Sequence, residues 1–319
     1  APAMIRRLHA DRSAQGLVFS AILLFDLASF LLYTADFLMI LEAKVRHQGA
    51  SDAAAYSAAL VRAEALATVA AMNHVLVWLA RAALGLVATV TALAALSVVN
   101  PAVLPLFSKA LATAIEWLPR LRSWSDRIAK AEDRLAALAP ILAAAEADRI
   151  ARANGAARGV ALPFSKLPLV REPDLPRYAG RVTGGLIPAS LFSRFYGGGS
   201  AGDDLGSAAK SSSDRARLGR FRQILRDVTS NPWPLPRVLD RRFCQESLTV
   251  AAFPGEKAFR LPFLASARAF HPSLGCPGAE GSPDNLYLVE GWSAELVPVN
   301  LKALAPLGLD RSAFGMLEH

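Results

Sequence analysis

Few residues in this sequence have the types and spacing that enzyme chemistry requires. Gly198, Ser200 and Gly202 match the G-x-S-x-G pattern, in which a serine nucleophile stands on a sharp strand-to-helix turn. Here the serine lies in a stretch rich in glycine and serine with no strong strand before it, so we expect no catalytic role. The five histidines show no metal-ligand spacing, and no phosphate-binding glycine loop opens a helix. The sequence therefore predicts a protein that is not an enzyme and that holds neither a metal nor a cofactor.

Two carboxylates, Asp26 and Asp36, lie within a long apolar tract, where acidic groups normally face protein or water rather than lipid. On a helix they share one face with Ser29 and Tyr33. We interpret these four residues as a polar stripe that packs against a partner helix or the interior of an assembly. The alternative is that Asp36 lies near the membrane interface and that local hydration accommodates Asp26.

Cys244 and Cys276 are the only cysteines. If the region that contains them lies outside the cytoplasm, a disulfide between them would stabilise it by a few kcal/mol. If that region is cytoplasmic, they are two buried thiols.

A basic amphipathic helix is predicted at residues 214–228, with five residues on its apolar face: Leu218, Phe221, Ile224, Leu225 and Val228. Five arginines occupy most of its remaining surface: Arg215, Arg217, Arg220, Arg222 and Arg226. This surface fits an anionic membrane or a partner; the alternative is a surface helix packed on its own domain. Nucleic acid is not expected, because it fits poorly with a chain built around a membrane anchor.

The element that positions the carboxylates is an apolar helix at roughly residues 17–41. About 20 apolar residues are enough to cross a bilayer, and this tract is too long for a signal-peptide hydrophobic region. Arg6, Arg7 and Arg12 precede it, so the positive-inside rule places the N-terminus in the cytoplasm. We predict that residues 1–43 are a basic cytoplasmic tip and a transmembrane anchor.

Residues 44–155 are predicted to be a helical stalk or hairpin, since no proline occurs between Pro2 and Pro101 and alanine, leucine, arginine and glutamate dominate. The uncharged tract 82–99 is long enough for a second span, but the same small residues suit a tightly packed helical hairpin. An even number of spans would return the C-terminal part to the cytoplasm. Pro140 should kink or split the following helix, and Asn154 with Gly155 should end it.

Residues 156–319 are predicted to form a small, loop-rich α+β domain, because prolines accumulate and short strand-like runs appear between turn signals. The expected strands are 248–253, 258–263, 264–270, 286–290 and 292–299. The whole chain is therefore assigned to the α+β class. Its net charge of +8 suits an anionic membrane surface or nucleic acid without choosing between them.

Two parts of the chain carry a family resemblance. Directly after the anchor, Gln48, Asp52, the run 53–55 and Ala59 form a Q-x-x-x-D-A-A-A-x-x-x-A pattern on a helix. Together with the residues around 11–16 and the late tryptophan-containing segment, it is similar to the TadE/TadG-like proteins of bacterial Flp (tight adherence) pilus systems. The resemblance covers about residues 11–75 and one short piece near the end.

This resemblance implies a non-enzymatic, membrane-anchored component of a Tad/Flp-type pilus assembly or secretion system, a minor pilin-like or assembly subunit that acts by helix packing and surface display. It implies other subunits as partners, an oligomeric assembly and a place in the bacterial inner membrane, with the main body periplasmic or extracellular. The alternative is a two-span inner-membrane scaffold whose basic cytoplasmic domain binds a protein partner or the membrane surface.

Overall fold

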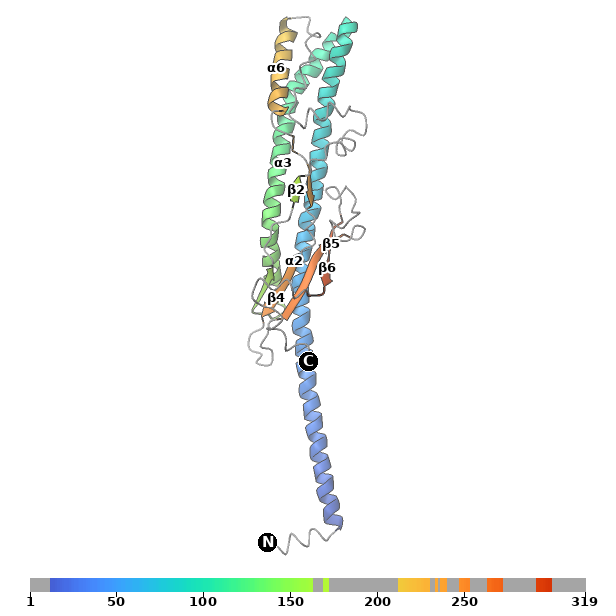
Figure 1. The fold of residues 1–319 in the computed structure, drawn as a ribbon, viewed down its shortest axis with the longest axis vertical. Helices are drawn as coiled ribbons and strands as arrows, with labels where there is room; N and C mark the ends of the chain where they lie inside the picture. Colours follow the sequence, from blue (N-terminus) through green and yellow to red (C-terminus); the bar gives the residue numbers. More distant parts are fainter. Residues whose placement is uncertain are drawn as a thin grey trace.

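The computed structural model consists of a long helical hairpin, a third helix packed near its tip and two small antiparallel sheets (Figure 1). The residues that it describes are 12–162, 169–171, 212–229, 233–234, 236–239, 247–252, 263–271 and 291–299. Most of these residues are helical, and the coarse α+β class predicted from the sequence is consistent with them.

The first arm of the hairpin, helix α2 (Arg12–Val99), is 88 residues long. It contains no proline, so nothing interrupts its hydrogen-bond ladder. Its first part projects alone from the described body, and every residue from 16 to 42 is exposed (Figure 1). This helix contains a segment long and apolar enough to cross a membrane.

The turn of the hairpin contains two prolines, Pro101 at the start of η1 and Pro105 at the start of α3. A short 3-10 helix, η1 (Pro101–Val103), leads directly into helix α3 (Leu104–Ala153), which runs back along α2. Near the turn, large apolar side chains fill the space between the two arms: Leu84, Val87 and Val90 share one cluster with Phe107 and Leu111. Toward the base the core is made of alanines, which lets the helices approach closely.

Helix α3 is one continuous element of 50 residues with Pro119 and Pro140 inside it. Of the two outcomes expected at Pro140, a split is therefore wrong. Pro140 is itself buried, and Ala136, Ala139 and Ala143 on either side of it are buried against the rest of the hairpin. This packing supports the helix where the proline removes a backbone donor. The predicted end of the helix is confirmed: Gly155 has φ +88°, and Ala156 N–H donates to Ala151 O at 3.0 Å.

A four-stranded antiparallel sheet covers the base of the hairpin in the order β1-β4-β5-β6. Its strands are β1 (Arg158–Leu162), β4 (Ser247–Ala252), β5 (Phe263–Phe270) and β6 (Ser293–Val297). A second, two-stranded sheet pairs β2 (Leu169–Arg171) with β3 (Arg237–Leu239). The third helix, α6 (Ser212–Thr229), packs on α3 near the hairpin turn.

Three of the predicted strands are confirmed to within two residues, since β4, β5 and β6 correspond to 248–253, 264–270 and 292–299. The expected strand 286–290, and most of 258–263, lie outside the described residues. The described strands share their core with the hairpin: Ala269 and Trp292 cluster with Ala63 and Leu66 of α2.

Candidate functional site

The alanine pattern that follows the anchor lies at the junction between α2 and the sheet. Gln48 Nε2 donates to Asp52 Oδ1 at 2.8 Å and to the backbone oxygen of Leu264 in β5 at 3.1 Å. Ser51 Oγ donates to the backbone oxygen of Phe263 at 3.3 Å. These bonds join the start of the stalk to the start of β5, so Gln48 of the pattern and the neighbouring Ser51 connect two elements far apart in the sequence.

The alanines in and next to the pattern divide between two neighbours. Ala55 and Ala59 pack with Ala265 and Ala267 of β5 and with Ala294 of β6. The alternate positions Ala54 and Ala58 face α3 and the strands β1 and β4, in a cluster with Ala143 and Ala147. All four helix alanines are fully buried. A larger side chain on either face would separate α2 from a sheet or from its hairpin partner, because interiors are close-packed.

Two histidines pack at the edges of the same junction. His47 lies against the ring of Phe263 with 5.4 Å between centroids, and His271 meets the ring of Trp292 edge-on at 5.6 Å. Gly291, which precedes that tryptophan, has φ +89° and lies beside His271. Among the described residues no group of three or more His, Cys, Asp or Glu side chains could hold a metal ion. Each histidine thus contacts one aromatic ring at this junction.

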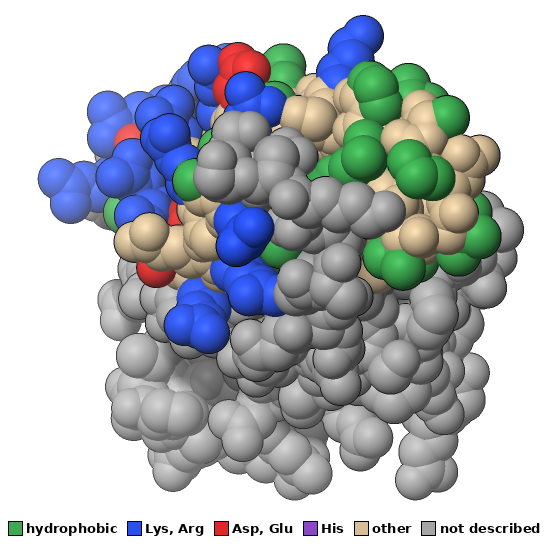
Figure 2. All heavy atoms as spheres, turned by 90° about the horizontal axis from the view of Figure 1, so that it is seen from above, with side chains coloured by type: hydrophobic (Ala, Val, Ile, Leu, Met, Phe, Trp, Pro, Cys, Tyr) green, Lys and Arg blue, Asp and Glu red, His purple; other side chains and the backbone are tan. Residues whose placement is uncertain are grey.

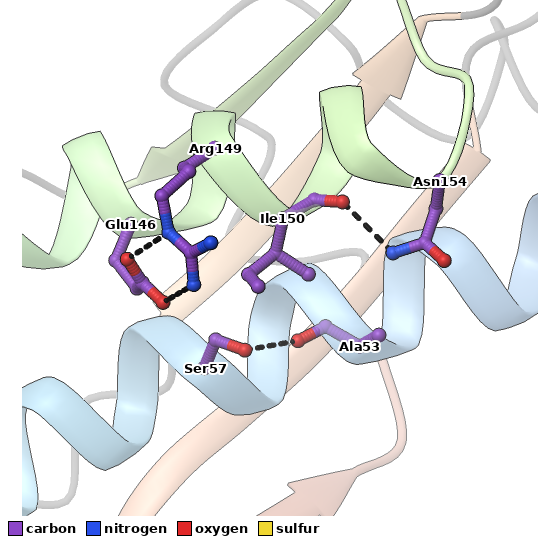
Figure 3. A network of polar contacts seen from close by, with 6 residues as sticks. All are labelled: Ala53, Ser57, Glu146, Arg149, Ile150 and Asn154. Atoms are coloured by element: carbon purple, nitrogen blue, oxygen red, sulfur yellow. Dashed lines mark hydrogen bonds and ion pairs between the residues drawn. The ribbon is translucent and has the colours of Figure 1, made fainter.

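Figure 3 shows the lower end of α3 beside α2, where each of the hydrogen bonds drawn stays within one helix or its cap. Glu146 receives two hydrogen bonds from Arg149, at 2.7 and 2.8 Å, and Ile150 lies between the two helices. Two residues further, Asp148 Oδ1 accepts the backbone N–H of Gly159 at 3.1 Å. That hydrogen bond, with help from Arg152, lowers the pKa of Asp148 below its ordinary value. The carboxylate thus links α3 to the first strand of the sheet.

Gly159 itself marks a close approach. A Cβ added there would lie 2.5 Å from the Cβ of Ala151 and 2.9 Å from the backbone oxygen of Ala147. The contact with backbone leaves no room for a side chain, so β1 can pair with β4 and lie on α3 only because this position is glycine.

One arginine of α2 is buried beside this junction. Arg62 is 5% exposed, and loss of water around its guanidinium lowers its pKa. Arginine nevertheless stays protonated at neutral pH.

The polar stripe predicted in the anchor, Asp26, Ser29, Tyr33 and Asp36, lies entirely on the projecting segment of α2. All four side chains are exposed, and Tyr33 is 82% exposed. Nothing in the described part of the chain packs on this segment, so its contacts stay a prediction.

The basic helix predicted at 214–228 is present as α6. Leu218, Phe221 and Leu225 are buried against the upper hairpin, so the helix packs on its own body, as one of the two interpretations expected. Its arginines nevertheless remain on the surface: Arg215, Arg217, Arg220 and Arg226 are exposed and Arg222 is half-buried. Seen from the hairpin end, lysine and arginine side chains gather on one side of the molecule (Figure 2).

Contacts with α3 fix α6 in position. Arg217 Nη1 donates to Ser108 Oγ at 2.7 Å, near the start of α3. Below it, Trp233 is 1% exposed and lies under the guanidinium of Arg122, 5.4 Å from the ring centroid. The role of Trp233 could not be predicted from the sequence, because an isolated tryptophan between prolines forms no periodic pattern.

The remaining sequence predictions fall outside the described residues: these are the basic tip with Arg6 and Arg7, the cysteine pair Cys244 and Cys276 and the Gly198–Gly202 serine motif. Comparison with protein-family profiles, with characterised proteins and with solved structures finds no match to this chain. The functional argument therefore depends on the residues and on their arrangement.

Proposed function

We propose that this chain is a non-enzymatic, membrane-anchored subunit of a Tad/Flp-type pilus assembly or secretion system that acts by helix packing and surface display. One observation carries the proposal: a single unbroken helix joins the exposed apolar segment 17–41 to the alanine pattern that packs against the sheet. A subunit of this kind needs an anchor, a stiff connection and a displayed body in that order. The similarity of residues 48–59 to the pattern of TadE/TadG-like proteins supports the choice of a Tad/Flp-type system.

The geometry of α2 favours one span over two. At about 1.5 Å per residue, Ala82 lies about 60 Å along the helix from Leu41, whereas a bilayer core is about 30 Å thick. If residues 17–41 lie in the bilayer, the tract 82–99 lies beyond it. That tract also has its own protein partners, since Leu84, Val87 and Val90 are buried with α3. With the N-terminus in the cytoplasm, the body then lies on the opposite side of the inner membrane.

The polar stripe fits a subunit that works in an assembly. A carboxylate exposed to lipid on an isolated helix is costly, and intramembrane acids normally face protein or water. Asp26 and Asp36 therefore favour a stripe that meets another subunit of the same machine.

Thiol accessibility in intact cells tests the topology. Cys244 and Cys276 should be oxidised or reactive toward a membrane-impermeant reagent, because a single span exports the region that contains them. If both thiols are reduced and become reactive only after the cells are opened, the body is cytoplasmic and the proposal fails in favour of the two-span scaffold.

A strain that lacks this chain tests the assembly role. We expect it to lose surface fibres, and complementation with Asp26→Ala/Asp36→Ala should restore membrane insertion without restoring fibres. Ser20→Ala, which removes an exposed hydroxyl from the anchor outside the stripe, is the matched control and should restore both. Normal surface fibres in the strain that lacks the chain would contradict the proposed function.

A further inference from the structure

The end of the molecule farthest from the anchor is an apolar turn. The name crown is used here for residues 96–106, which join α2 to α3. No charged residue occurs between Ala82 and Ser108. Four large apolar side chains of the crown are exposed: Leu96 at 53%, Val98 at 47%, Val99 at 84% and Leu106 at 59%. Viewed from this end, apolar side chains gather on one side of the surface (Figure 2).

The backbone N–H groups at the turn of the crown are already satisfied without water. Asn100 N–H donates to Leu96 O at 2.8 Å, and its side-chain oxygen accepts the N–H of Ala102 at 3.0 Å. Val103 N–H donates to Asn100 O at 3.1 Å, and Leu104 N–H donates to Pro101 O. The two remaining positions of the turn are Pro101 and Pro105, which have no N–H. Each N–H from residue 100 to 105 is thus bonded or absent, so none of these donors loses a bond to water when the turn enters an apolar phase.

A basic surface lies directly beside the crown. Arg217 of α6 is bonded to Ser108, two residues beyond the crown, and the exposed Lys109 follows. Arg215 and Arg220 are exposed on the same helix. Figure 2 shows these two properties side by side, with lysine and arginine on one side and apolar side chains on the other. Apolar groups that insert, flanked by cations that meet phosphates, are the pattern of a surface that binds anionic lipid.

We propose that the crown docks onto an anionic lipid surface, with Val98, Val99 and Leu106 inserted among the acyl chains and the arginines of α6 at the headgroups. This bilayer is distinct from the one that holds the anchor, since α2 extends about 85–90 Å from Leu41 to Val99. Duplex nucleic acid would neutralise the arginines but leave the apolar crown in water. The chain then acts as a rod that links two lipid surfaces, one permanently and one reversibly.

The test uses the full-length chain held by its anchor in nanodiscs of neutral lipid, so that only the crown is free to meet added vesicles. Flotation with vesicles containing 30% phosphatidylglycerol should recover the protein, whereas pure phosphatidylcholine vesicles should not. High salt should weaken recovery, because it screens the arginines. Equal recovery with both vesicles, or recovery with neither, overturns the proposal.

Two variants separate the contributions of the crown and of α6. Val99→Asp/Leu106→Asp should abolish flotation, and Arg215→Gln/Arg220→Gln should lower the partition coefficient about 25-fold, at roughly fivefold for each arginine. The matched controls are Ile141→Asp and Arg134→Glu, exposed residues of α3 outside the crown and α6, which should float like wild type. All variants are exposed at the altered positions, and circular dichroism verifies their helix content.

Two outcomes contradict the lipid assignment. Loss of flotation in the Ile141→Asp and Arg134→Glu controls to the same degree as in the crown variant would mean that the crown has no special role. A gel shift with duplex DNA that is tighter than vesicle binding and unchanged by Val99→Asp/Leu106→Asp would make the basic surface a nucleic-acid site.

The inference depends on the anchor only through insertion into the nanodisc, which is measured separately by co-purification with the disc. Failure of the anchor is thus distinguishable from failure of the crown.

Discussion

At the scale of single residues, alanine decides how closely the stalk and the sheet approach. Ala55 and Ala59 present only methyl groups to β5, and the side chains of β5 that pack on them, Ala265 and Ala267, are equally small. Contact between four such small side chains brings backbone near backbone, which allows Gln48 to reach the carbonyl oxygen of Leu264. The alanine pattern is therefore a packing surface as well as a run of good helix formers.

Enlarging this surface should destabilise the protein. We expect Ala55→Leu or Ala59→Leu to lower the free energy of unfolding by about 1–3 kcal/mol, because the added atoms enter a fully buried contact. Ala71→Leu, at an exposed position of the same helix, should change it by less than about 0.5 kcal/mol. Denaturant unfolding of the detergent-solubilised chain, followed by circular dichroism, measures both. Equal stability of the two variants would show that the alanine contact is loose.

The Asp148 carboxylate should make stability depend on pH. Its pKa is lowered in the folded state, chiefly by the N–H of Gly159, so the ionised form is favoured by folding. The contribution is complete above the unfolded pKa of about 3.9 and disappears as pH falls through the lower folded value. Asp148→Asn should therefore melt below wild type at pH 7, and the difference should vanish in strongly acidic solution. Glu64→Gln, which removes an exposed carboxylate from α2, is the control. A difference between Asp148→Asn and wild type that does not change with pH would contradict this role.

At the scale of elements, what the sequence could predict depended on how far apart the contacts lie. The whole of α2 follows from the absence of proline, and α6 follows from its periodic apolar face. The strands β1, β2 and β3 escaped prediction, because each has three to five residues and forms through a distant partner, as Val160 does with Val250. The contacts of the site could not be predicted for the same reason. Gln48 belongs to a pattern that the sequence shows, but its acceptor, the carbonyl oxygen of Leu264, is 216 positions away.

The contact between α3 and β1 gives a prediction about glycine. Gly159→Ala should lower the free energy of unfolding by about 1–3 kcal/mol, because its Cβ would meet the backbone of α3 at 2.9 Å. Gly85→Ala is the matched control within helix α2. A Cβ at position 85 has nothing within 4 Å, so alanine should stabilise the helix by up to about 1 kcal/mol. Opposite signs for the two substitutions are the expected result in thermal unfolding, and a stabilising Gly159→Ala would contradict the packing.

At the scale of the whole molecule, the chain separates three properties along one axis. The apolar segment of α2 lies at one end, the alanine junction with its sheet follows, and the crown with the basic surface of α6 lies at the other end (Figure 1). The two apolar tracts that the sequence offers as membrane spans therefore have different surroundings. Residues 17–41 are exposed, whereas the tract 82–99 is partly covered by α3.

This difference predicts distinct environments for two labels on one helix. In neutral proteoliposomes, a fluorophore at Phe30→Cys should be shielded from iodide in water, whereas one at Thr89→Cys should be quenched, because position 89 is exposed and lies about 70 Å along α2 from Leu41. Cys244 and Cys276 are replaced by serine in both proteins, and circular dichroism verifies the helix content. Neutral lipid prevents the crown from meeting a second charged bilayer. Shielding of both labels would mean that 82–99 also crosses the membrane and that the hairpin opens there, whereas quenching of both would mean that 17–41 is no anchor.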